Sequence, residues 1–256
     1  MNSLSFPPDM KLVGSYSSYW VVWAKPLAEV QSLLPAGLEL APQTITPAST
    51  HPIMFAFGLQ QNVHLNDFRF VFNLNYLEHV TSIPFVRPIG EQKQNFLYMP
   101  KLFLNEFLPV FGGDTIWGFH KELADVEFKD ERFSVKTELS HKLQLSLTFK
   151  VTGDYASPAT FPNFAAVEAM LTQPFVLDET LIMKLCLGCQ IPYVAANFNW
   201  YLDEATLRPI QAELAIINAY VRGLQPGKYA TPGIDQVPLG AFQLQNHWDL
   251  SMPFCC

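Results

Sequence analysis

The chain has 256 residues, enough for one large domain or two small ones. Charged residues make up only 15% and hydrophobic residues 49%, so few charges are available to cover a surface. We therefore predict a large core, with part of the surface buried in a homo-oligomer. The net charge of -7 and the absence of a Lys/Arg cluster argue against a nucleic-acid partner.

The N-terminal residues 1–9 lack the basic and apolar regions of a secretory signal. The longest apolar runs, such as Tyr19 to Ala24, are too short to span a bilayer. We predict a cytoplasmic protein with no membrane partner.

The four cysteines are Cys186, Cys189, Cys255 and Cys256. The spacing of the first two is typical of redox or zinc sites, but adjacent cysteines at a chain end are poor tetrahedral ligands. The six histidines show no metal-ligand spacing either. We expect buried free thiols that pack as small hydrophobic side chains, and no metal or other cofactor.

Taken in chain order, the hydrophobic patterns predict many strands and few helices. After an irregular lead-in over 1–14, strands are expected at 16–24, 52–59, 68–78, 96–104, 123–128, 132–139, 142–151, 182–191, 206–217 and 239–250. Helices are expected at 26–34 and 161–171, a helical turn ended by Gly112-Gly113 at 105–111, and loops at 41–52, 80–95, 197–201 and 224–227. This pattern favours one all-β barrel or sandwich with small helical additions.

The strand predicted at 68–78 places an acid on an aromatic face. Period-two alternation puts Phe72, Leu74, Tyr76 and Glu78 on the same side. A buried carboxylate needs a partner, since an unpaired buried charge is costly. The alternative is a strand-end glutamate that points into water.

Residues 113–124 place a single cation, Lys121, among apolar and aromatic neighbours. Loss of hydration favours the neutral amine of a lysine, and a neutral amine can condense with a carbonyl to form a Schiff base. The resulting iminium accepts the electrons of a breaking neighbouring bond. The alternative is a surface lysine whose stem packs on apolar neighbours while its ammonium stays in water.

The segment Gly118-Phe-His-Lys121-Glu-Leu-Ala124 resembles the lysine motif of the acetoacetate decarboxylase superfamily. Leu33 to Leu38, Asn75-Tyr-Leu-Glu78 and Ala241 to Pro253 resemble three other family segments, in the same order. The resemblance implies a single domain over residues 1–256, built as a closed, cone-like β-barrel of mostly antiparallel strands with a few short peripheral helices. It also implies an apolar pocket, an imine-forming lysine and frequent oligomers.

The sequence departs from the family pattern around the lysine. Glu122 replaces the second lysine of the family pair and His120 replaces a proline. An anion beside Lys121 would raise its pKa, unless the two side chains diverge as they do on a strand. The family's substrate-binding arginine has no match, and Lys25 is the nearest cation.

These observations predict a Schiff-base lyase that decarboxylates a small β-keto acid. Lys121 would attack the ketone and Glu78 would act as general acid and base. The expected substrate-binding residues are Lys25, Tyr76, Trp117, Phe119 and His120. Two alternatives remain open: related imine chemistry such as aldol condensation and dehydration, and a non-catalytic barrel that binds a small apolar carbonyl ligand.

Overall fold

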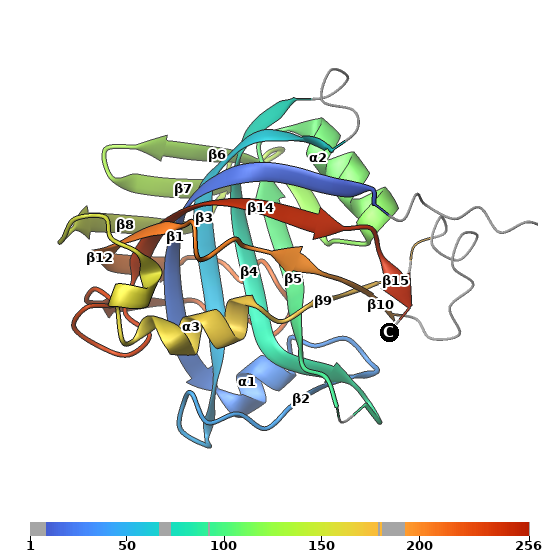
Figure 1. The fold of residues 1–256 in the computed structure, drawn as a ribbon, viewed down its shortest axis with the longest axis horizontal. Helices are drawn as coiled ribbons and strands as arrows, with labels where there is room; N and C mark the ends of the chain where they lie inside the picture. Colours follow the sequence, from blue (N-terminus) through green and yellow to red (C-terminus); the bar gives the residue numbers. More distant parts are fainter. Residues whose placement is uncertain (1–8, 67–72, 92, 179, 181–192, 256) are drawn as a thin grey trace, which may run out of the picture.

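A closed ring of hydrogen-bonded strands organises the chain (Figure 1). The computed structural model describes residues 9–66, 73–91, 93–178, 180 and 193–255. The ring contains β1 (Lys11–Pro26), β3 (Thr50–Leu65), β4 (Leu74–Pro88), β5 (Phe96–Leu104), β6 (Lys121–Lys129), β7 (Arg132–Thr137), β8 (Leu143–Val151), β12 (Thr206–Ile216) and β14 (Phe242–Ser251). The spatial order is β5-β6-β7-β8-β12-β14-β1-β3-β4, and β4 pairs with β5 to close the ring. Every pairing in the ring is antiparallel except β5 with β6, which confirms the predicted closed, mostly antiparallel barrel.

Shorter elements decorate this ring. The additional strands are β2 (Leu38–Leu40), β9 (Phe175–Asp178), β10 (Tyr193–Ala196), β11 (Phe198–Asn199), β13 (Gly227–Thr231) and β15 (Phe254–Cys255). The helices are α1 (Leu27–Gln31), α2 (Phe107–Gly112), α3 (Phe164–Leu171), the π-helix η1 (Gly113–Trp117) and the 3₁₀ helix η2 (Pro158–Thr160). Figure 1 shows α1 with β2 at one end of the barrel and α2 at the other.

The long strands are apolar on both faces, which accounts for the low charge content. Along β1, Tyr16 and Trp20 join one hydrophobic cluster, while Tyr19 and Val21 join a second cluster on the other side of the sheet. The ring strands enclose the second cluster, and the decorating elements α3, β9 and β11 cover the first. The sequences of such strands are continuous apolar runs rather than a strict alternation of apolar and polar residues.

The predicted loop at 80–95 is wrong, because β4 continues to Pro88. Ser82 and Pro84 suggested a loop, yet Ser82 pairs with Met54 of β3 and is buried. The pairing of β4 with β5 shifts register on both sides of Ile83. Such irregularities accommodate a proline, which cannot donate a ladder hydrogen bond.

Three other predictions need correction. The lead-in ends earlier than expected, since β1 begins at Lys11. The two glycines after α2 do not end the helical segment, because η1 continues it to Trp117. The strands β2, β9, β10, β11, β13 and β15 were not predicted, and β11 lies within the loop expected at 197–201. Residues 68–72 and 182–191 of two predicted strands lie outside the described part of the chain.

Cys255 is exposed and disulfide-bonded, so the expectation of a buried free thiol is wrong for this residue. The other three cysteines lie outside the described residues. Within the described ranges, no helix is long and apolar enough to cross a membrane.

A buried histidine of β4, His79, lies inside the ring, on the face of the strand opposite Glu78. The His79 side chain is fully buried, and its ring nitrogens pair with the Ala56 carbonyl oxygen at 3.0 Å and the Thr81 hydroxyl at 2.9 Å. Burial lowers the pKa of His79 to about 3, although the bond to Ala56 opposes this shift. His79 is therefore neutral in the folded protein.

This depressed pKa predicts acid sensitivity. Below the unfolded-state pKa of 6.5 the unfolded chain binds a proton that the folded chain does not, so stability falls as the pH decreases toward 3. Between about pH 7 and pH 4.5, His79 should cost the folded state roughly 2 to 3 kcal/mol. Urea unfolding of the wild type and of His79→Gln at both pH values measures this. Equal losses in the two proteins would contradict the assignment.

Candidate active site

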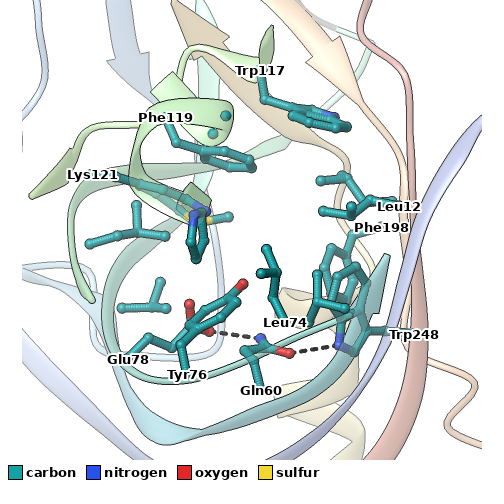
Figure 2. Close-up of a pocket in the computed structure, with 18 of the residues that line it drawn as sticks. Leu12, Gln60, Leu74, Tyr76, Glu78, Trp117, Phe119, Lys121, Phe198 and Trp248 are labelled. Atoms are coloured by element: carbon teal, nitrogen blue, oxygen red, sulfur yellow. Dashed lines mark hydrogen bonds between the residues drawn. The ribbon is translucent and has the colours of Figure 1, made fainter. Parts of the chain in front are cut away.

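One large cavity lies on the outer face of the nine-strand ring, between β1, β3, β4, β5 and β14 and the segments that cover them, and we call it the central cavity. Its volume is about 590 Å³, and β1, β3, β4, β5, β14 and the α2–η1 segment contribute to its lining. Most of the lining is apolar or aromatic, and among the described residues its only lysine and carboxylate are Lys121 and Glu78. Figure 2 shows both side chains facing the same space.

The turn between η1 and β6 places Lys121 at the start of a strand. Gly118 has φ 77°, a left-handed conformation that glycine adopts readily, and a Cβ there would lie 2.0 Å from the Asp178 carbonyl oxygen. The Asp114 carboxylate then accepts a hydrogen bond from the Lys121 backbone N–H at 2.8 Å. This hydrogen bond holds the Lys121 backbone in place at the point from which the side chain extends into the cavity.

The Lys121 side chain passes directly over Gly113. A Cβ at position 113 would lie 2.5 Å from both Cδ and Cε of Lys121 and 2.7 Å from its Nζ. No side chain fits there without moving the lysine, because real Cβ atoms do not approach this closely. The glycine therefore provides the space that the lysine occupies.

Gly113→Ala should displace the Lys121 amine and reduce its reaction with ketones about tenfold or more, since small misplacements of a reacting group cost rate steeply. Gly112→Ala is the matched control, because a Cβ there has no neighbour within 4 Å and both glycines have helical dihedral angles. Adduct formation under borohydride measures the effect, with thermal melting as a check of folding. Equal adduct yields in the two variants would show that Gly113 does not position the lysine.

Burial lowers the pKa of Lys121, while the negative charges of Glu78 and Asp114 oppose that shift. The Phe119 ring lies beside the amine, with Nζ 5.4 Å from the ring centroid. Glu122 points elsewhere and forms an ion pair with Lys101 of β5. Consecutive side chains of the strand diverge, so the Glu122 carboxylate does not offset the desolvation of Lys121.

Glu78 is also held in this cavity. Only 4% of it is exposed, and its Oε1 accepts a hydrogen bond from Nε2 of Gln60 at 2.8 Å. The indole N–H of Trp248 donates to Oε1 of the same glutamine, also at 2.8 Å (Figure 2). Burial raises the pKa of Glu78, and this effect is opposed by the Lys121 charge and by the Gln60 and Tyr16 side chains.

Two tyrosines complete the polar side of the cavity. Tyr16 and Tyr76 both line it, and burial together with the Glu78 charge raises both of their pKa values. The Tyr16 hydroxyl is buried without a partner in good hydrogen-bond geometry, although it lies close enough to Glu78 to lower the pKa of that carboxyl. Both phenols stay protonated at neutral pH, so each can donate or accept a hydrogen bond but carries no charge.

Residues 4–178 match the family model for acetoacetate decarboxylase. The chain belongs to the acetoacetate decarboxylase family. A search of curated proteins gave no match.

Several solved structures share the fold at low sequence identity. Acetoacetate decarboxylase from Legionella pneumophila superposes with a TM-score of 0.57 and 14% identity, over 99% of this chain and 88% of that one. An acetoacetate decarboxylase-like enzyme from Sphingomonas wittichii gives a TM-score of 0.62 at 11% identity, over 97% and 93%. The enduracididine biosynthesis enzyme MppR complexed with pyruvate gives 0.61 at 12% identity, over 96% and 89%.

The structure brings together most of the site residues expected from the family motif. Lys121, Glu78, Tyr76, Trp117 and Phe119 all line the central cavity. The remaining two, His120 and Lys25, are not part of its lining.

His120 points away from the cavity, with Nε2 3.2 Å from Oδ2 of Asp178. Lys25 pairs with Glu29 at 2.8 Å, and its amine lies 3.9 Å from the centroid of the Trp23 ring. The positions of these two residues do not support the expected substrate-binding roles. Among the described residues, no arginine lines the cavity.

Sequence reasoning missed Gln60, Trp248 and Asp114. Gln60 is the first residue of a polar stretch, Gln60 to Asn62, that follows the apolar run 52–59, so no local pattern marks it as a buried partner. The contact between Trp248 and Gln60 joins residues 188 positions apart, for which no local pattern exists.

Proposed function

We propose that this member of the acetoacetate decarboxylase family is a Schiff-base lyase that decarboxylates a β-keto acid. The observation that carries the proposal is the Lys121 amine, buried in an apolar cavity that it shares with one carboxyl group, Glu78. Desolvation supplies the neutral amine that attack on a ketone requires.

In the first step, the Lys121 amine adds to the ketone carbon of the substrate. The carbonyl oxygen gains two protons and leaves as water, so that a carbon–nitrogen double bond replaces the carbon–oxygen double bond. One of these protons comes from the amine, and Glu78 in its protonated form supplies the other. The raised pKa of Glu78 keeps a larger fraction of it protonated near neutral pH, as a general acid requires.

In the second step, the bond between the carboxylate carbon and the α-carbon breaks. Its electron pair moves toward the iminium nitrogen, carbon dioxide leaves and a neutral enamine forms. A proton from solvent adds to the α-carbon and restores the iminium. Water then adds to the iminium carbon and releases the ketone and the free amine, and the proton set free in this hydrolysis returns to the Glu78 carboxylate. This step neutralises both the negative carboxylate and the positive iminium. An apolar cavity favours this loss of charge because it solvates a separated ion pair poorly.

Contacts with the substrate come from the aromatic lining. In Figure 2, Phe119 lies next to Lys121, Trp117 lies at the top of the cavity between Phe119 and Leu12, and Tyr76 lies beside Glu78. The Trp117 indole N–H donates to the Ser251 carbonyl oxygen at 3.1 Å, which fixes the orientation of its ring. These three residues would pack on the keto acid and exclude water.

Condensation with an aldehyde is the second candidate, because the same enamine is a carbon nucleophile. A cavity of about 590 Å³ has room for two small reactants at once. One structural neighbour, MppR, is described with the condensation product of pyruvate and imidazole 4-carboxaldehyde.

Product analysis tests the proposal. The protein is incubated with a series of 3-oxo acids, and separately with pyruvate plus an aldehyde, and each is compared with the protein-free rate. Faster release of carbon dioxide from a 3-oxo acid supports decarboxylation, and a condensation product supports the second candidate. If neither appears while an apolar ketone still binds, the protein is a ligand-binding barrel.

A further inference from the structure

We infer that the substrate is a keto acid with an extended apolar chain, such as a medium-chain 3-oxo acid, rather than acetoacetate. This inference rests on the proposed function, because it assumes that the ketone of the substrate reaches Lys121. It extends that proposal to the part of the keto acid that takes no part in the reaction, its apolar hydrocarbon chain.

The reacting groups occupy only one side of the central cavity. In Figure 2, Lys121 lies opposite Leu12, Phe198 and Trp248, with open space between them. Phe198 stacks on Trp248 with their ring centroids 5.1 Å apart, and the Trp248 N–H is already taken by Gln60. The far side therefore offers an apolar wall and no free hydrogen-bond donor from these three residues.

The volume of the cavity exceeds what a short keto acid needs. At about 30 Å³ per water molecule, a cavity of about 590 Å³ equals roughly twenty waters. Acetoacetate would fill only a small part of it, and the remaining space would be apolar surface facing water. An apolar chain that replaces this water gains free energy with each buried methylene group.

The rim of the cavity is apolar as well. Leu108 and Phe111 of α2 belong to the cavity lining, yet 51% and 59% of these residues are exposed. They mark where the cavity meets solvent, at an edge that also carries the exposed Phe107. A chain-bearing substrate can contact this rim while it enters, whereas a small hydrophilic acid gains nothing from it.

Methyl ketones of increasing length test the inference, because they are the decarboxylation products and form the same imine. Acetone, 2-pentanone and 2-heptanone are incubated with the protein and borohydride, and the concentration that gives half-maximal adduct is measured for each. This concentration should fall about three- to fourfold per methylene, or roughly 100-fold from acetone to 2-heptanone.

A variant tests where the hydrocarbon chain of the substrate binds. Leu12→Phe fills the far side, so it should raise the half-maximal concentration of 2-heptanone at least tenfold and that of acetone less than twofold. Leu139→Phe is the matched control, because 98% of Leu139 is exposed, and it should change neither value.

The outcomes separate the two proposals. If the three ketones give half-maximal adduct at similar concentrations, the inference of a substrate with an extended apolar chain is wrong, while the imine chemistry still holds. Absence of any adduct in folded wild-type protein would overturn the proposed function, and the chain assignment with it. The ketone series on the wild type decides the question even if Leu12→Phe does not fold.

Discussion

Replacing Lys121 with methionine should reduce decarboxylation of a 3-oxo acid by about 10⁴-fold or more, to near the protein-free rate. Methionine keeps the length of the side chain and fills the space over Gly113, but it has no amine to form the imine. Carbon dioxide release, followed with and without protein, measures the loss.

Lys101→Met is the control for this variant. Lys101 lies on the neighbouring strand β5 and pairs with Glu122, outside the cavity lining, so its loss should leave the rate within about twofold. Similar activity in wild type and Lys121→Met would exclude Lys121 as the nucleophile.

The pH profile carries further information about the lysine. Only the neutral amine attacks the ketone, so activity should rise with pH as Lys121 loses its proton. Because burial lowers the pKa of Lys121, this rise should occur below the pH at which an ordinary lysine titrates, 10.5.

Glu78→Gln should lower the rate by about 10²- to 10⁴-fold, the usual contribution of a general acid or base. Glutamine has the same shape but cannot supply or accept the proton. The variant should also move the acid limb of the pH profile to lower pH, since the Glu78 charge is the largest effect that raises the pKa of Lys121. A purely structural role for Glu78 would not predict this shift.

Glu122→Gln provides the control for Glu78. Its carboxylate faces Lys101 on the other side of β6 and is not among the causes of the Lys121 pKa shift. We expect an unchanged acid limb and a rate within about twofold of the wild type. An acid limb that stays in place in Glu78→Gln would contradict the electrostatic coupling between Glu78 and Lys121.

The two reacting groups were predictable because local patterns encode them. Period-two alternation placed Glu78 on the same face as Tyr76, and both line the cavity. The apolar neighbours of Lys121 indicated desolvation, and its position on a strand allowed Glu122 to point away. Both features depend only on residues next to one another in the sequence.

The errors arose where distant contacts override local composition. Ser82 and Pro84 suggested a loop, but β3 and β5 flank this part of β4 and bury it. Lys25 was chosen for its place in the chain order, whereas its side chain is drawn to Glu29. The link from Trp248 through Gln60 to Glu78 requires the assembled sheet, which places β14, β1, β3 and β4 side by side.

Three expectations from composition and resemblance stay predictions. They are the single domain over residues 1–256, the homo-oligomer and the cytoplasmic location. Light scattering on purified protein would test the second of these directly.

Mass spectrometry of protein treated with borohydride and a keto compound tests the central claim most directly. Acetoacetate, pyruvate and 2-heptanone are each offered, and the modified protein is digested and mapped. We predict a stable adduct on Lys121 that is absent from Lys121→Met, and the mass of the acetoacetate adduct will distinguish intact from decarboxylated substrate. A folded wild-type protein that forms no adduct, or forms it only on other lysines, would contradict the account.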